Sequence, residues 1–393
     1  MAEQELVGLL KRLVAIPSVS PESTNDPTIA GEEKMADFAA HYLSERGFKV
    51  EWDQVQPGRP NILARYGSGG HRRTLMLESH LDTVGVTGMK RSPFEARIDG
   101  NRMYGRGTCD TKGPMAAALH AMSPARLEKL AGAGYEIVFA GAMGEETGNV
   151  GAGHMVERGV RADQILVLEP TELNVIHAHK GAIWFEIDVS GVAAHGSNPD
   201  KGINAISAMA DLLIMLREQI AEERDRLRNP VLGSPTLNIG AIRGGTAVNI
   251  VADRCVVQID RRTLPEEHHD DVLGRIGQTL KGFQQAGRIK TYEIRILKAG
   301  VPFETSVDSS LVRALEGACR RANVPARKEG AAWYSDAGPL SKVCSEIAVF
   351  GPGSISQAHT TEEFIDLDSL QAGCDVLRNF FDALVEQANN AGA

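Results

Sequence analysis

The 393-residue chain lacks several features that would direct it to particular classes of protein. No apolar run approaches the roughly 20 residues that a membrane-spanning helix needs, so no membrane partner is expected. Basic charge is not in excess, since 42 Lys and Arg stand against 51 Asp and Glu and give a formal net charge of −9. A nucleic-acid-binding protein favours a basic face, so no nucleic-acid partner is expected either.

Cysteine is scarce and is not arranged in pairs. The five cysteines, an odd number, lie at 109, 255, 319, 344 and 374 without a recurring spacing. The first 20 residues have no small-residue cleavage site after an apolar core and are typical of a helix, not of a signal peptide. Together these observations predict a reduced, cytoplasmic setting.

Two styles of hydrophobic pattern divide the chain. Helical spacing near 6–13 and 35–42 alternates with short apolar runs, and these predict strands at 48–52, 61–66, 74–78, 135–140 and 165–168. Short strands that are apolar on both sides and alternate with helices favour an α/β domain, with a largely parallel sheet covered by helices.

The pattern changes after about residue 179. Apolar and polar residues alternate from 183 to 189, a long helix is predicted at 202–226, and the order strand-helix-strand-strand-helix-strand closes near 292–297. This order is typical of a small α+β sandwich with one buried sheet face. We therefore expect a catalytic domain of residues 1–178 and 298–393, interrupted by an inserted domain at 179–297.

Potential metal ligands follow several of the apolar runs. In LMLESHLDTV at 75–84, His80 comes just after a buried strand, where open α/β sheets build their sites. Asp82, two residues on, points to the same side and is placed to accept the free N–H of a metal-bound His80. The alternative is a surface histidine after a strand.

The glycine-rich segment GRGTCDTKG at 105–113 precedes an alanine-rich helix near 115–121. Glycine lets the backbone approach an ion closely, and Asp110 at the helix entrance is suited to bridge two cations. An ordinary N-cap aspartate explains it equally well. The spacing of a phosphate-binding Walker loop is absent.

Carboxylates also follow the next strands. Glu145 and Glu146 are adjacent after the run that ends at 140, and Glu169 ends the run at 166–168. Two carboxylates that are held close together shift each other's pKa. It is therefore chemically sensible that one of them binds a metal and the other acts as a base. His359 follows the run at 346–350 and completes a set of two imidazoles and three carboxylates, which predicts a two-metal hydrolytic site.

These ordered motifs, from IPSVS at 16–20 to HTTEE at 359–363, resemble the metal-dependent amidohydrolase family of acetylornithine deacetylase, succinyl-diaminopimelate desuccinylase, carboxypeptidase G and aminoacylase. The resemblance covers essentially the whole chain and implies a dizinc catalytic domain with an inserted dimerisation lid. One zinc would be held by His80, Asp110 and Glu169, and the other by Asp110, Glu146 and His359. Glu145 would be the general base, and the Asp110–Thr111 peptide bond would be cis. Cobalt or manganese are possible substitutes for zinc.

The inserted domain carries matching segments. GVAAHGS at 191–197 resembles the lid segment whose histidine, here His195, reaches the partner subunit's site in a homodimer and stabilises the oxyanion. GGTAVN at 244–249 and DRR at 260–262 resemble substrate-contacting segments. The resemblance implies that Asn249 contacts the substrate and that Arg262 clamps its carboxylate, a task that suits a planar guanidinium. His195 as a turn residue and Arg262 paired with a structural acid are the alternatives.

The implied reaction is hydrolysis of an N-acyl amino acid by a water that Glu145 deprotonates. Glutamate at 169 and the segment 354–359 resemble the acetylornithine deacetylases, whereas YSDAG at 334–338 is nearer the desuccinylases. A dipeptidase or carboxypeptidase of the same family is the closest alternative. A non-catalytic binding protein would lack a ligand or the base, and a two-metal phosphoesterase would favour basic phosphate contacts.

Overall fold

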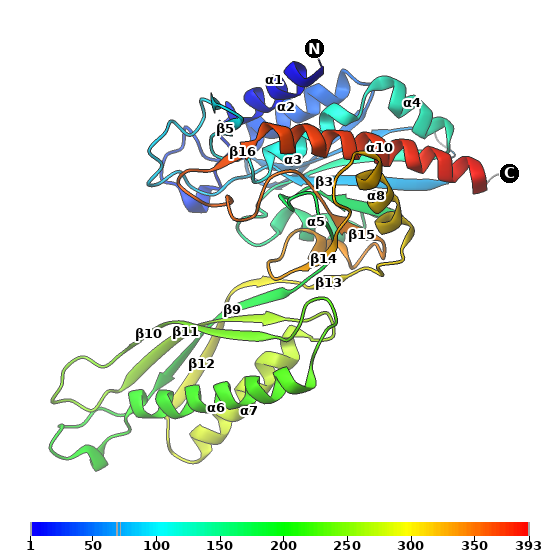
Figure 1. The fold of residues 1–393 in the computed structure, drawn as a ribbon. Helices are drawn as coiled ribbons and strands as arrows, with labels where there is room; N and C mark the ends of the chain where they lie inside the picture. Colours follow the sequence, from blue (N-terminus) through cyan, green and yellow to red (C-terminus); the bar gives the residue numbers. More distant parts are fainter. Residues whose placement is uncertain (1, 68–69, 71, 392–393) are drawn as a thin grey trace. The chain divides into compact units, whose positions relative to one another are not determined.

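A computed structural model describes residues 2–67, 70 and 72–391, in which the chain forms two compact units (Figure 1). The first comprises the described residues of Met1–His177, Glu304–Gly330 and Ser335–Ala393, and the second comprises Ala178–Phe303 and Ala331–Tyr334. The first unit is therefore built from segments that precede and follow the second in the sequence.

The main sheet is parallel at its centre and antiparallel at its edges. Its strand order is β1-β2-β6-β3-β7-β15-β8-β13, with β14 paired to β8. The pairs β6/β3, β3/β7 and β7/β15 are parallel, whereas β1/β2 and β2/β6 are antiparallel. The strands are β1 (Lys49–Gln56), β2 (Arg59–Tyr66), β3 (Arg73–His80), β6 (Tyr135–Ala142), β7 (Gln164–Val167), β8 (Val175–His179), β13 (Phe303–Glu304), β14 (Lys328–Ala331) and β15 (Ile347–Val349).

Helices cover this sheet because its central strands are apolar on both faces. Leu77 of β3 and Phe139 of β6 are fully buried and share one core with Leu10, Leu315 and Phe380 of the helices. Burying each such side chain stabilises the fold by about 1.5–3 kcal/mol. The helices of this unit are α1 (Ala2–Val14), η1 (Pro21–Ser23), α2 (Glu33–Ser44), α3 (Lys112–Ala121), α4 (Pro124–Gly132), α5 (Val150–Glu157), α8 (Ser310–Arg321), α9 (Ala337–Leu340) and α10 (Leu367–Ala391).

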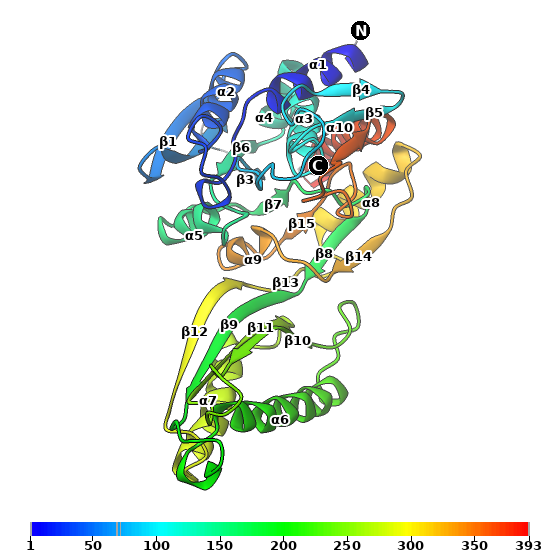
Figure 2. The same cartoon turned by 90° about the vertical axis from the view of Figure 1, so that its left-hand side faces the viewer.

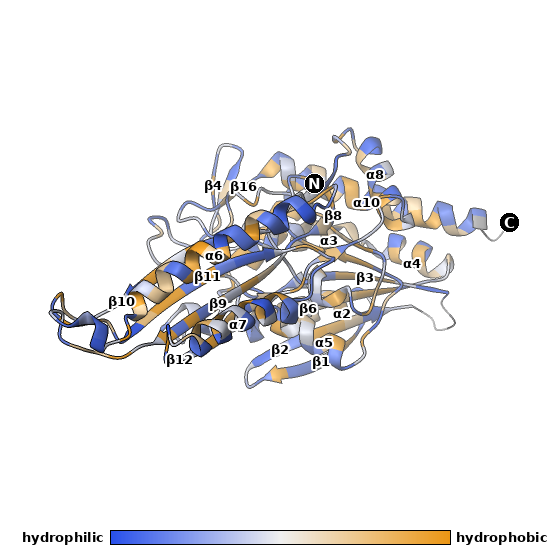
Figure 3. Cartoon of the chain, turned by 90° about the horizontal axis from the view of Figure 1, so that it is seen from below, coloured by the Kyte–Doolittle hydropathy of each residue, from blue (hydrophilic) through white to orange (hydrophobic). Residues whose placement is uncertain are grey.

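The second unit is a four-stranded antiparallel sheet with two long helices on one face (Figure 2). Its strand order is β10-β11-β9-β12, and Phe185 of β9 and Val257 of β11 are buried against Leu212 and Ile276 of the helices. Figure 3 shows polar and apolar residues alternating along both helices, as one buried helix face requires. The elements are β9 (Gly181–Ser190), η2 (Pro199–Lys201), α6 (Ala205–Arg226), β10 (Thr236–Gly244), β11 (Arg254–Thr263), α7 (His269–Gln285) and β12 (Thr291–Gly300).

The predicted fold class, an α/β domain with an inserted α+β sandwich, is confirmed. The sequence did not predict the small sheet of β4 (Arg97–Asp99), β5 (Arg102–Tyr104) and β16 (Phe364–Asp366), because these short strands are mostly not buried and no apolar run marks them. Across the described part of the chain, no helix combines the length and the apolar character that crossing a bilayer requires. All five cysteines are free and buried.

Candidate metal centre

His80 is the last residue of β3 and is buried at the carboxyl end of the parallel strands. Its Nδ1 lies 2.9 Å from the main-chain oxygen of Asp82. A carbonyl oxygen only accepts, so Nδ1 carries a proton and Nε2 is the nitrogen that would bind a cation. The carboxylate Oδ1 of Asp82 is 3.6 Å from the same Nδ1, so the main chain and the side chain of Asp82 both face this ring nitrogen.

The carboxylate of Asp82 mainly holds the neighbouring acidic loop. It accepts the backbone N–H of Glu145 at 3.1 Å and that of Glu146 at 3.3 Å. The hydroxyl of Ser20 donates to it at 2.5 Å. Because Asp82 is fully buried, these bonds tie the segment after β6 to the end of β3.

Asp110 lies between the two histidines. Its Oδ1 is 3.0 Å from His80 Nε2, and its Oδ2 is 3.3 Å from His359 Nε2. The peptide bond from Asp110 to Thr111 is cis, as the family resemblance implies. Asp110 also precedes the N-cap of α3, which is Thr111, so it is not itself the helix cap.

The remaining donors lie around Asp110. Glu146 Oε2 is 2.9 Å from His359 Nε2, and Glu169 Oε1 is 3.9 Å from His80 Nε2. His359 has a φ of 62°, in the left-handed region that a non-glycine residue rarely adopts. Such backbone conformations cluster at functional sites, where the surrounding structure holds them.

The side chains form two donor groups that share Asp110. One is His80, Asp110 and Glu169, the other is Asp110, Glu146 and His359, and the donor atoms within each group lie within 4.8 Å of one another. Donors about 2.0–2.2 Å from a common zinc ion lie some 3–4 Å apart, so both groups fit a cation of this size. Imidazole and carboxylate donors suit zinc and its neighbours in the first transition row.

The electrostatics of the two groups favour bound cations. Burial raises the pKa of Glu145 and Glu169 well above the usual value; the charge of His80 opposes the rise and nearby carboxylates add to it. Hydrogen bonds to Asp110 and Glu146 raise the pKa of His359 to about 10. Crowded acids that resist ionisation and imidazoles that hold protons are both relieved by a divalent cation.

Glu145 lies in neither donor group. It is the residue before Glu146, it is mostly buried, and its Oε1 accepts a hydrogen bond from Asn149 Nδ2 at 3.2 Å. The charges of His80, Glu146 and Asp110 all affect the pKa of Glu145, so its carboxyl group lies beside the two donor groups.

The other three predicted site residues lie in the second unit. His195 is exposed, and its Nδ1 is 2.7 Å from the Ser197 hydroxyl. Asn249 is exposed and its main-chain oxygen accepts the N–H of Gly196 at 2.7 Å, so it adjoins the His195 segment. Arg262 contacts Asp260 at 2.9 Å, which is the structural pairing that the sequence left open.

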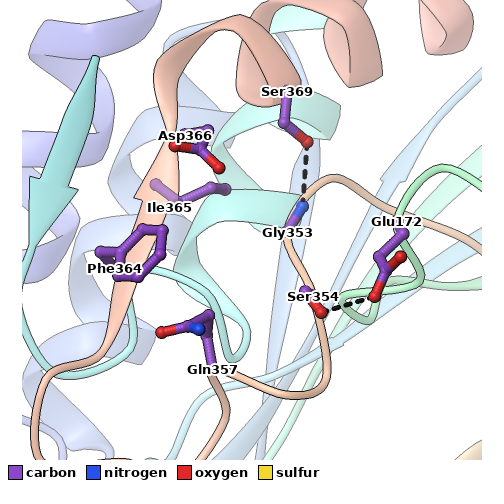
Figure 4. A pocket seen from close by; sticks show the side chains of 8 residues that line it. All are labelled: Glu172, Gly353, Ser354, Gln357, Phe364, Ile365, Asp366 and Ser369. Carbon is purple, nitrogen blue, oxygen red and sulfur yellow. Dashed lines mark hydrogen bonds between the residues drawn. The ribbon is translucent and has the colours of Figure 1, made fainter.

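A surface pocket of about 370 Å³ lies beside the loop that carries His359. Figure 4 shows Ser354 bonded to Glu172, at 2.6 Å, and the N–H of Gly353 bonded to Ser369, at 3.2 Å. No predicted site residue lines the pocket, and its acids are already paired, Glu172 with Ser354 and Asp366 with Arg102. It therefore adds nothing to the candidate centre.

Sequence reasoning gave no role to three buried residues that hold this centre: Asn149, Asp336 and Glu363. Glu363 is part of the HTTEE motif, but its partners lie in the Asp110 loop, more than 250 residues away. For these residues the sequence offered one local indication: Asn149 directly follows Gly148, and this pair is typical of a turn.

Comparison with known proteins shows the family of the chain. The model of Peptidase family M20/M25/M40 matches residues 76–383, and the chain belongs to that family. It is a hydrolase with a site fitted for metal.

One curated relative and two solved structures resemble the chain over most of its length. An acetylornithine deacetylase of Edwardsiella ictaluri (strain 93-146) is 33% identical over 376 residues, covering 92% of this chain and 93% of that protein. An M20 family metallo-carboxypeptidase from Sulfolobus solfataricus has a similar fold, with a TM-score of 0.77 and 20% identity, over 97% of this chain and 99% of that one. A dinuclear metal-binding M20 peptidase from Bacillus subtilis has a TM-score of 0.71 and 14% identity, over 98% and 99%.

Proposed function

We propose that this protein hydrolyses the amide bond of an N-acyl amino acid and releases a carboxylate and a free amino acid. The observation that carries the proposal is the sharing of Asp110 by two donor groups, with the carboxyl group of Glu145 beside them. The relatives named acetylornithine deacetylase support this substrate class.

Two divalent ions are proposed at the two donor groups. His80, Asp110 and Glu169 would hold one, and Asp110, Glu146 and His359 the other. Zinc is the first choice, with cobalt or manganese as substitutes. When bound, such a pair supplies Lewis-acid activation of the attacking water and of the amide carbonyl.

Glu145 would carry the proton through the reaction. It accepts a proton from the water as the water oxygen bonds to the amide carbon. It then gives that proton to the leaving nitrogen as the carbon–nitrogen bond breaks, so the base is regenerated. Burial is the largest cause of its raised pKa. A carboxyl group with a raised pKa is better suited to exchange protons near neutral pH.

The second unit would supply substrate contacts. His195 of a partner subunit is proposed to stabilise the oxyanion, and Asn249 to contact the substrate. Arg262 is proposed to bind the substrate carboxylate, which requires the substrate to replace or share Asp260 as its partner. A homodimer formed through this unit and a cytoplasmic setting, in keeping with five free cysteines, complete the proposal.

The test is amine release from a panel of N-acetyl, N-succinyl and N-formyl amino acids together with dipeptides, each with added zinc and with a chelator. We expect cleavage of an N-acyl amino acid that the chelator abolishes. Cleavage confined to dipeptides would instead assign the peptidase reaction, which the names of structural neighbours such as the metallo-carboxypeptidase represent. No cleavage by a protein with two bound metals would contradict the proposal.

A further inference from the structure

A buried amide links the carboxyl group of Glu145 to a distant part of the chain. Asn149 Nδ2 donates to Glu145 Oε1 at 3.2 Å and to Asp336 Oδ1 at 2.9 Å. Asn149 is 5% exposed and Asp336 is 1% exposed, so solvent does not compete for these bonds. Asp336 lies near Glu78 of β3, two residues before His80, and the two carboxyl groups affect each other's pKa.

The backbone alone does not account for asparagine at this position. Asn149 is the N-cap of α5, with φ 58° and ψ 35°, yet its side chain makes no capping bond. The N–H groups of Gly148 and Asn149 both donate to the Glu145 main-chain oxygen, at 3.0 and 3.1 Å, which makes a tight turn. Glycine would adopt this left-handed conformation at lower steric cost. The backbone therefore does not require asparagine, and the role of its side-chain amide needs another explanation.

The two carboxylates fix the orientation of that amide. A carboxylate oxygen without a proton only accepts, so the NH2 end of Asn149, with its two hydrogens, faces both Glu145 and Asp336. The opposite flip would place the amide oxygen against two acidic oxygens. Asp336 therefore selects the flip in which Asn149 donates to Glu145.

We propose that Asn149 is a positioning residue for Glu145, with Asp336 setting the orientation of its amide. The bond holds Oε1 of Glu145 and leaves Oε2 as the oxygen that accepts and returns the proton. This inference rests on the proposed function, because it assigns Glu145 as the base. Asn149 acts through Glu145 and is a member of neither donor group.

Loss of the amide should therefore lower turnover without weakening substrate binding. A freed carboxyl group samples other rotamers, and misplacement of a reacting group by about 1 Å costs up to 100-fold in rate. For Asn149→Gly, which keeps the left-handed backbone, we expect kcat to fall about 10- to 100-fold. KM and metal content should stay close to those of the wild type, whereas the melting temperature should fall, because two buried carboxyl oxygens lose their hydrogen-bond donor.

Exchanging the amide and the carboxylate between positions 149 and 336 distinguishes a role of Asn149 in positioning Glu145 from a purely structural role. Asn149→Asp puts a carboxylate against both acids, and the double variant Asn149→Asp/Asp336→Asn restores the bond between positions 149 and 336 with its direction reversed. If that bond were only structural, the double variant would recover activity. We expect it to recover melting temperature but not kcat, because position 149 still presents a carboxylate to Glu145.

The experiment measures kcat, KM, bound metal and melting temperature on the best substrate of the panel. Asn323→Gly is the matched control, since Asn323 is also left-handed, with φ 56°, but follows α8 outside the centre. Wild-type kcat in Asn149→Gly, or recovered kcat in the double variant, would overturn the inference alone. If Asn149→Gly does not fold, Asp336→Asn decides: lower kcat at unchanged KM supports the inference and wild-type kcat overturns it. Inactivity of the wild type on every amide would instead remove the proposed function, and this inference with it.

Discussion

Glu363 Oε1 accepts the backbone N–H of Asp110 at 3.1 Å, so a residue four positions after His359 holds the residue that both donor groups share. The same oxygen accepts the N–H of Cys109 at 2.9 Å. The other, Oε2, accepts from Gly107 at 3.0 Å and from Arg106 at 2.6 Å. Glu363 is fully buried. The two segments that bring Asp110 and His359 together are thus fastened by one carboxylate.

Replacing Glu363 by Gln should loosen the centre. The NH2 group of the glutamine would face hydrogen-bond donors in the place of one carboxylate oxygen, so the bonds to that oxygen would be lost. Each lost bond to a charged group costs about 1.5–3 kcal/mol. We expect a clear loss of stability and metal affinity lowered about 10- to 100-fold. Thermal melting and metal titration measure both. The control is the neighbouring Glu362→Gln, whose side chain is half exposed; equal effects in the two variants would contradict the account.

Glu145→Gln should separate metal binding from turnover. The substitution keeps the shape of the side chain but removes the oxygen that accepts a proton. Because Glu145 is in neither donor group, two metals should remain bound while kcat falls about 10²- to 10⁴-fold. Near-normal turnover in this variant would disprove the assignment of the base.

Metal removal should lower both activity and stability. A ligand that binds only the folded state stabilises it by about 2.7 kcal/mol when present at 100 times its Kd. The melting temperature should therefore fall when a chelator is added and rise again with added zinc, in parallel with activity. A melting curve that the chelator leaves unchanged would argue against metal binding at this centre.

Activity should be shared between subunits if His195 acts across a dimer. His195→Ala and Glu145→Gln would each be nearly inactive alone. Mixing and re-associating them makes heterodimers in which one site has both residues, so activity should return to about a quarter of the wild-type level for random pairing. No recovery from mixed dimers, verified by mass, would place His195 in its own subunit's site or outside any site.

Glu346 should give an acid-sensitive contribution to stability. Burial raises its pKa, but hydrogen bonds from Gln164, from Ser310 and from the first amides of α8 outweigh this and hold the pKa below the usual value. The folded-state pKa is thus depressed, so the contribution is present above pH 4.5 and is lost as the pH falls through the folded-state value. Glu346→Gln should lower stability by about 1 kcal/mol at pH 7. The difference in unfolding free energy between the wild type and this variant should shrink as the pH falls toward 3. Denaturant melts that give the same difference from pH 7 to pH 3 would contradict this prediction.

The parts of the centre that sequence could predict are those set by local pattern. His80 ends β3 and Glu169 comes two residues after β7, so the ends of parallel strands place them at one edge of the sheet. Asn149 and Asp336 could not be paired from sequence, because they meet across 187 positions and nothing in either local pattern identifies the other. The antiparallel edges escaped prediction for a related reason: an apolar run shows that a strand is buried, not which way its neighbour runs.

The most direct test of the account is hydrolysis of an N-acyl amino acid by metal-free protein as zinc is titrated in. The sharing of Asp110 by two donor groups predicts that activity rises until two equivalents of zinc are bound per chain. Full activity at one equivalent, or no hydrolysis with two equivalents bound, would contradict it.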